Sequence, residues 1–200
     1  MITYVVIDIE ADGPIPGPNS MISFGAVAIN KKGHVFGEFE VNLSPLENAQ
    51  PDSNTIKWFV KHAPEAFAYC KKNQINPKEG MKKFGSWLLS LPNPRVMAAH
   101  PAPLDFMWIN WYMQTFLKDE LEEPPFSKPF FDSKGQGAFD IKSYAVAKLN
   151  TDYTEIHRDN YPANLHDDSN HTHKAIDDAR EYSKLLIKLL NMESNETKTS

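Results

Sequence analysis

The first third of the chain consists of short apolar runs separated by turn residues. Residues 4–9 form a run rich in β-branched side chains, and residues 22–29 form a second one. Between residues 35 and 41, apolar positions alternate imperfectly with polar ones, after a Lys31-Lys32-Gly33 segment that suits a hairpin turn. The pattern predicts an antiparallel meander of three strands.

Apolar positions recur at helical spacing after Pro51. Asp52 or Ser53 can cap a first helix through residue 60, and Pro103 can occupy the first position of a later one. The remaining expected elements are helices at 64–70 and 77–91, a strand at 95–99, and helices at 103–116, 141–149 and 174–190. Residues 121–137 and 151–172 are expected to be irregular, and residues 192–200 to form a disordered tail.

Strands followed by helices that alternate with a strand favour an α/β fold, a mixed β-sheet flanked by α-helices. The chain has 200 residues, of which 41% are hydrophobic and 24% charged. These values are typical of a globular domain and argue against disorder. The length fits a single domain, which we place at residues 1–191.

The sequence lacks the features of a membrane or secreted protein. It has no run of about 18 apolar residues, and its N-terminus lacks the basic start and long apolar stretch of a signal peptide. Cys70 is the only cysteine, which excludes an intrachain disulfide and a zinc cage of cysteines. We therefore expect a cytoplasmic protein without membrane contact.

Two acids stand at the end of the very apolar first strand. Asp8 and Glu10 are two residues apart, so they share one face of the strand, roughly 6.5 Å apart along it. Like charges there repel unless something compensates them, and a divalent cation such as Mg²⁺ or Mn²⁺ is the usual compensation. The alternative is a simple strand end, where acids meet water.

Further acids fall at helix starts. Asp105 lies in the first turn expected after residue 103, where the helix dipole alone stabilises a carboxylate, but the following helix is apolar on most sides and favours a buried site. Asp178 borders the apolar stripe of the last helix, whereas Asp177 is expected to be solvated. His173 can reach the same site as Asp178 only from the preceding loop, because five helical residues turn by about 140°.

Other positions are weaker candidates. His100 follows a strand and is either structural or a neighbour of the site, and Asp140 is expected to cap a helix. Surface positions are expected for His157, His166 and His171. Core positions are expected for Trp58, Trp87, Trp108 and Trp111. The lysines more often form a solvated face than a phosphate-binding patch, although such a patch can coexist with the net charge of −5.

Together these residues resemble the DEDDh branch of the DnaQ-like 3′→5′ exonucleases, which share a ribonuclease-H-like fold. The first motif of that family, Asp-x-Glu, matches Asp8 and Glu10. The second, His-Asn-x-x-Phe-Asp, matches His100 and Asp105, and the third, His-x-Ala-x-x-Asp-Ala, is matched in full by residues 173–179. The resemblance covers roughly residues 3–190, although residues 121–172 match little of it.

The second motif departs from the family at two positions. Pro101 and Leu104 stand where Asn and Phe are usual. The departure affects the expected loop conformation and substrate contacts but leaves the acid in place.

The resemblance implies a two-metal phosphodiester hydrolase. Two Mg²⁺ or Mn²⁺ ions would be held by Asp8, Glu10, Asp105 and Asp178, with Asp8 bridging them. His173 would act in its neutral form as general base, so activity should fall as it becomes protonated. The products would be nucleoside 5′-monophosphates released from the 3′ end.

The resemblance also suggests substrate contacts and assembly. The backbone around Ala11 and Asp12, with His100 nearby, would contact the terminal nucleotide. Single-stranded RNA is favoured over single-stranded DNA, because the small stand-alone subgroup resembles exoribonucleases. Such members are often homodimers that share basic residues between sites. A catalytically silent relative that binds a nucleic-acid end or a partner protein is the alternative, and the intact acid and histidine set argues against it.

Overall fold

The computed structural model describes residues 1–117, 137–165 and 172–193. Its strands are β1 (Thr3–Ala11), β2 (Met21–Ile29), β3 (Val35–Asn42), β4 (Arg95–Ala99) and β5 (Phe139–Asp140). Its helices are α1 (Ser53–His62), α2 (Pro64–Cys70), α3 (Pro77–Ser90), α4 (Ala102–Leu117), α5 (Ile141–Leu149) and α6 (Ala175–Asn191), with a 3₁₀ turn, η1, at Arg158–Asn160. The expected elements agree with these within about two residues, apart from β5 and η1, which were not expected.

The strands form one mixed sheet in the order β3-β2-β1-β4-β5. β1, β2 and β3 pair antiparallel, which confirms the predicted meander. β4 pairs parallel to β1, and β5 pairs parallel to β4 through only two residues. β1 therefore lies at the centre of the sheet. β4 pairs with its first residues, Thr3–Val6, and only β2 pairs with it as far as Ala11.

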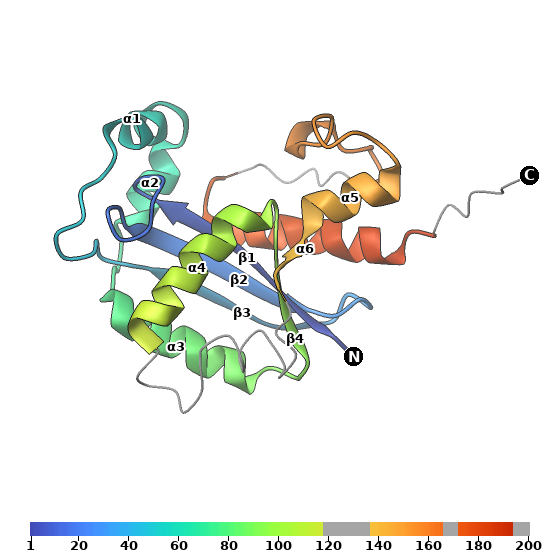
Figure 1. Cartoon of the computed structure of the whole chain (residues 1–200), viewed down its shortest axis with the longest axis horizontal. Helices are drawn as coiled ribbons and strands as arrows, with labels where there is room; N and C mark the ends of the chain where they lie inside the picture. The colour runs from blue at the N-terminus through green and yellow to red at the C-terminus, as the bar shows by residue number, and fades with distance from the viewer. Residues whose placement is uncertain (118–136, 166–171, 194–200) are drawn as a thin grey trace, which may run out of the picture.

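Helices cover both faces of this sheet (Figure 1). On one face, Val5 and Ile7 of β1 belong to the core that includes α3 and α4, and on the other, Val6 packs with α5 and α6. Because both faces are covered, β2 is buried along its whole length. α1 and α2 lie at the end of the sheet where β1 ends (Figure 1).

Two predicted helix caps are confirmed. The Asp52 side chain accepts hydrogen bonds from the backbone N–H groups of Asn54 and Thr55, at 3.1 and 2.8 Å, and so starts α1. Asp140 caps α5 by accepting from the N–H of Ser143 at 2.6 Å. These bonds satisfy N–H groups that a helix start leaves without a partner in the helix.

The expectation that the tryptophans are core residues is wrong at one position. Trp108 is fully buried, and Trp87 and Trp111 pack against the core. Trp58, however, is 43% exposed, because only Phe59 of α1 is buried against the rest of the molecule. An exposed tryptophan ring therefore stands on α1.

Some expectations fall partly or wholly outside the described residues. These are the irregular character of residues 118–136 and 166–171, the surface positions of His166 and His171, and the tail from residue 194. His157, which is described, is exposed as expected. Within the described chain, no helix combines the length and the apolar character that crossing a membrane requires.

Candidate active site

The C-terminal half of β1 carries two acids on one face of the sheet. Val5, Ile7 and Ile9 alternate with them and are buried against the α3–α4 layer. Because successive strand side chains point to opposite faces, Asp8 and Glu10 both point toward the α6 side. Strand periodicity alone thus places the two carboxylates together.

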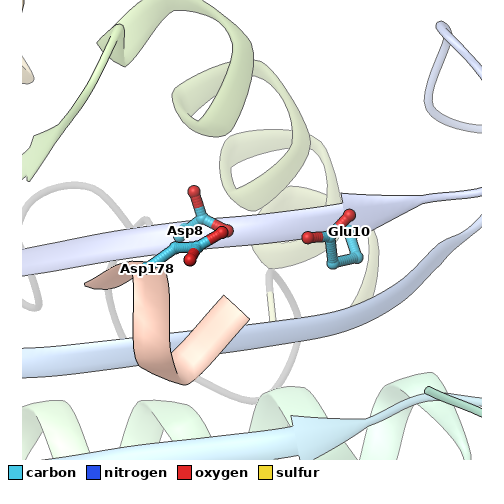
Figure 2. A group of neighbouring side chains, drawn as sticks. All are labelled: Asp8, Glu10 and Asp178. Carbon is cyan, nitrogen blue, oxygen red and sulfur yellow. The ribbon is translucent and has the colours of Figure 1, made fainter. Parts of the chain in front are cut away.

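The first turn of α6 brings a third acid to this pair. Gly25 of β2, the partner of Asp8 in the sheet, allows the approach, because a Cβ there would collide with the backbone of Ile176. Asp178 is 4% exposed, facing inward as predicted. Carboxylate oxygens of Asp8, Glu10 and Asp178 lie within 4.8 Å of one another, and Figure 2 shows the three side chains gathered between β1 and α6.

Asp105 approaches the same region from the first turn of α4. It is 4% exposed, and its Oδ1 accepts a hydrogen bond from the backbone N–H of Ile9 at 3.1 Å. Ile9 separates Asp8 from Glu10, so this bond fixes a fourth carboxylate beside them. Asp105 is outside the group whose oxygens lie within 4.8 Å, but its charge raises the pKa of both Asp8 and Glu10.

The carboxylates of the site lie close enough to repel one another when they are ionised. Removal from water is the largest cause that raises the pKa of Asp8 and Glu10 well above the usual range, and neighbouring carboxylates add to it. Burial raises the pKa of Asp105 to about 7, although the hydrogen bond from Ile9 opposes the shift. Converging oxygen donors of this kind fit a hard divalent cation, which would neutralise their charge.

The protein without bound metal is expected to be more stable at pH 6 than at pH 8. For an acid whose folded pKa is raised, the stabilisation is complete below the unfolded pKa and is lost as the pH rises through the folded pKa. For Asp105 that loss occurs around pH 7, and Asp8 and Glu10 shift in the same direction. Thermal unfolding in EDTA at both pH values tests this, and a higher Tm at pH 8 would contradict it.

Mg²⁺ or Mn²⁺ should reverse this pH dependence, because bound cation stabilises the ionised carboxylates. At pH 8 we expect the Tm to rise with metal concentration. Ca²⁺ and Na⁺ at matched ionic strength separate specific binding from general screening.

His173 lies on the loop before α6, as its spacing from Asp178 requires. Its φ is 54°, a left-handed backbone conformation that is uncommon for a residue other than glycine. Its ring packs edge-on against Trp58 of α1, with centroids 5.2 Å apart. The histidine is therefore positioned from α1 on one side and from the α6 loop on the other.

Asp177 lies on the polar face of α6 as expected, with 33% of its side chain exposed, and it also forms contacts that the sequence did not indicate. Its Oδ2 accepts a hydrogen bond from Thr172 Oγ1 at 2.8 Å, and its Oδ1 lies 2.9 Å from Arg180 Nη1. Arg180 in turn pairs with Glu38 of β3 at 2.6 Å. This chain of contacts ties the loop that carries His173 to α6 and to the sheet.

The residues expected to touch a terminal nucleotide have structural contacts of their own. Ala11 lies at an irregularity of the β1–β2 pairing, directly after Glu10. Asp12 is 5% exposed, and its Oδ1 accepts from the backbone N–H of Ser20 at 2.6 Å. Its backbone carbonyl accepts from the N–H of Asp52 at 2.8 Å, which anchors the start of α1 beside the strand end.

His100 packs between two tyrosines. Its Nε2 lies 2.6 Å from the Tyr161 hydroxyl, and its ring stacks on Tyr182 with centroids 4.6 Å apart. Burial lowers the pKa of His100 to about 4, so the ring is neutral near pH 7. Tyr182 lies one turn after Asp178, so His100 supports the helix that carries this acid.

The sequence gave no indication of one ion pair that lies close to the acids. Arg158, in the segment expected to be irregular, lies 3.0 Å from Glu181 of α6, whose side chain is 11% exposed. Glu181 adds to the electrostatic effects that raise the pKa of Asp8. The pair joins η1 to α6 close to the acids, and no motif or spacing marks either residue.

The chain matches the family model described as Exonuclease (RNase_T) over residues 5–186. The 3′-5′ DNA exonuclease Cap18 of Escherichia coli is 25% identical to it over 202 residues, which cover 98% of this chain and 95% of the relative. The solved nuclease domain of 3′hExo, a DEDDh family member bound to rAMP, gives a TM-score of 0.68 at 16% identity, covering 94% of this chain and 91% of the other. E. coli exonuclease I in complex with a dT13 oligonucleotide gives 0.66 at 13% identity, covering 95% and 41%.

The match spans most of the sequence, so the chain belongs to this exonuclease family. Its mixed five-stranded sheet flanked by helices is the ribonuclease-H-like fold of its structural neighbours, as predicted. The protein is therefore an enzyme of the exonuclease class, similar to a 3′-5′ DNA exonuclease and to a DEDDh family member. This confirms the prediction of an enzyme of the exonuclease class.

Proposed function

We propose that Asp8, Glu10, Asp105 and Asp178 hold two divalent cations, Mg²⁺ or Mn²⁺, and that the protein uses them to hydrolyse single strands from the 3′ end. The observation that carries the proposal is the group of three carboxylates whose oxygens lie within 4.8 Å, with Asp105 fixed beside them. The cations would supply charge neutralisation at the scissile phosphate.

The chain's own groups would orient substrate and move the proton. His173 accepts a proton from the attacking water as the water oxygen forms a bond to phosphorus, and the bond from phosphorus to the 3′ oxygen breaks. That oxygen takes up a proton from solvent and stays on the shortened strand as its 3′ hydroxyl, and a nucleoside 5′-monophosphate leaves. The loop position of His173 suits this role, because the ring can be directed toward the acids from outside the helix. Buried His100 stays neutral and supports Tyr182 instead.

The sugar of the substrate has two candidates. The resemblance to exoribonucleases favours RNA. The E. coli relative that covers 98% of this chain is named a DNA exonuclease, which supports single-stranded DNA. We give DNA precedence because that relative is 25% identical to this chain, against 16% for the nuclease domain bound to rAMP. A cytoplasmic location and a homodimer, as expected from the sequence, are further parts of the proposal.

Matched strands of DNA and RNA with one sequence test this function. Each is labelled at the 5′ or the 3′ end and incubated with Mg²⁺, Mn²⁺ or EDTA. We expect stepwise shortening of 5′-labelled strands and early release of a labelled mononucleotide from 3′-labelled ones, both only with metal. Endonucleolytic fragments, or turnover in EDTA, would contradict the proposal, and the faster sugar decides between DNA and RNA.

Asp177→Ala is expected to lower kcat by about 10- to 100-fold, with KM and Mn²⁺ affinity nearly unchanged. The substitution removes the contacts to Thr172 and Arg180 that fix the loop of His173, and small misplacements of a reacting group are costly. Asp177→Asn should restore part of the rate, because its amide oxygen can still accept from Thr172.

Glu79→Ala is the matched control for this variant, because it breaks an exposed ion pair with Lys83 on α3. Equal rates for both alanine variants would show that the loop contacts do not position His173. A large loss of Mn²⁺ affinity in Asp177→Ala would instead place Asp177 among the metal-binding residues.

A further inference from the structure

α1 and α2 carry a concentration of positive charge in an acidic protein. Residues 53–74 contain four lysines and one glutamate, a net charge of +3, whereas the whole chain has a net charge of −5. All four lysines, Lys57, Lys61, Lys71 and Lys72, are exposed. Among the described residues, neither Lys57 nor Lys61 forms an ion pair, although the charge of Lys57 acts on Asp52 at the N-cap of α1. We call residues 53–74 the α1–α2 surface.

This surface is fixed beside the candidate active site. Phe59, Ala63 and Ala66 pack against Ile22 of β2, close to where β1 ends. α1 and α2 stand at that end of the sheet (Figure 1). A cavity of about 410 Å³ is lined jointly by the α1–α2 corner and by His173 with its two neighbours. A strand whose 3′ end reaches the acids therefore has this surface as a direct neighbour.

An exposed aromatic ring accompanies the lysines. Trp58 lies between Lys57 and Lys61 in α1 and is 43% exposed. Its ring contacts His62 and His173, with centroids 5.6 and 5.2 Å away, so it is held in place at the edge of the site. Lysines for the backbone and an aromatic ring for the bases are the combination by which proteins bind single strands without sequence preference.

We propose that the α1–α2 surface binds the single strand directly upstream of the terminal nucleotide. Lys57 and Lys61 contact phosphates, and a base stacks on Trp58. This inference rests on the proposed function, because it assumes that the 3′ end lies at the acids. The surface resolves an electrostatic conflict, since a cluster of acids in a chain of net charge −5 repels a polyanion. It also supplies basic residues within one subunit, where the resemblance suggested a second one.

Binding of a fluorescein-labelled dT20 strand in EDTA tests the surface without turnover. Lys57→Ala/Lys61→Ala should raise the Kd about 10-fold at low salt and reduce the salt slope of log K by about 1.4, the value for two single-strand phosphate contacts. Trp58→Leu should raise the Kd about 10-fold with an unchanged salt slope, because stacking releases no counterions.

Lys31→Ala/Lys32→Ala is the matched control. Both lysines are exposed in the β2–β3 turn, next to Ile29, which pairs with Tyr4 at the opposite end of β1 from Glu10. The control removes the same charge and should leave the Kd within about twofold of the wild type. The proposal would be overturned if both double variants raised the Kd for dT20 equally. It would also be overturned if neither variant raised it.

Kinetics separate this proposal from the proposed function. With Mg²⁺ or Mn²⁺, Lys57→Ala/Lys61→Ala should raise KM on dT20 but leave turnover of a dinucleotide unchanged. The single phosphate of a dinucleotide is the scissile one, so no upstream phosphate remains for these lysines to contact. A wild-type protein that binds dT20 through these lysines but hydrolyses no strand would refute the proposed function and retain the surface. Normal hydrolysis with an unchanged KM in the double variant would refute the surface alone.

Discussion

Asp8→Asn is expected to abolish turnover while it stabilises the protein without metal. The substitution removes a carboxylate from the centre of the acid group, where burial and the charges of Asp105, Glu10 and Asp178 all raise the pKa of Asp8. Loss of several kcal/mol of charge stabilisation by the cations corresponds to a rate at least about 10³-fold lower. In EDTA at pH 8, the same change relieves repulsion and should raise the Tm by about 5 °C.

The two opposite effects identify a functional acid better than either alone. A residue needed only for folding would lose activity and stability together. Asp152→Asn, at an exposed position, is the matched control and should change neither quantity. Measurable turnover by Asp8→Asn in Mn²⁺, or a lower Tm in EDTA, would remove Asp8 from the proposed metal-binding set. The stabilisation should be smaller at pH 6, where more of the carboxyl is already protonated.

The parts of the site that sequence could predict follow from local periodicity. Asp8 and Glu10 share a face because strand side chains alternate, whatever else the chain does. Asp178 faces inward, 4% exposed, because its helix has one apolar stripe that it borders. The position of His173 outside α6 follows from the same helical geometry. These predictions need only the geometry of a single element.

The features that the sequence did not predict depend on contacts between segments far apart in the chain. Asp177 is partly exposed as expected, but the sequence did not indicate its contacts with Thr172 and Arg180. Arg180 in turn contacts Glu38, 142 residues away. β5 has two residues, too few for a hydrophobic pattern, and is defined by its pairing with β4. Trp58 is apolar and was expected to be buried, yet only tertiary packing determines which side of α1 is covered.

The net charge of the chain likewise did not indicate where its positive and negative charges lie. The value of −5 sums a cluster of acids that would bind cations and a separate run of lysines on α1 and α2. The two groups have opposite roles toward a nucleic acid, and only the fold shows that they are neighbours. Net charge sums over the whole molecular surface, whereas a bound substrate contacts only part of that surface.

His173→Gly is expected to lower kcat by about 10²- to 10⁴-fold, the usual contribution of a general base, while Mn²⁺ binding is retained. Glycine suits this position because the backbone φ is 54°, so the loop can keep its conformation without the side chain. The Tm should change little, in contrast to Asp8→Asn. Isothermal titration with Mn²⁺ and thermal unfolding check both expectations beside the kinetics.

Added imidazole distinguishes a base from a structural residue. Removal of the ring leaves space beside Trp58, which His173 contacts in the wild type. Free imidazole in that space should restore part of the rate in His173→Gly, more at pH 8 than at pH 6, because only the neutral form accepts a proton. His34→Gly, at an exposed position on the β2–β3 turn, should neither lose activity nor respond to imidazole. A variant with more than one-tenth of the wild-type rate, or a deficit that imidazole leaves unchanged at every pH, would contradict the role of His173 as general base.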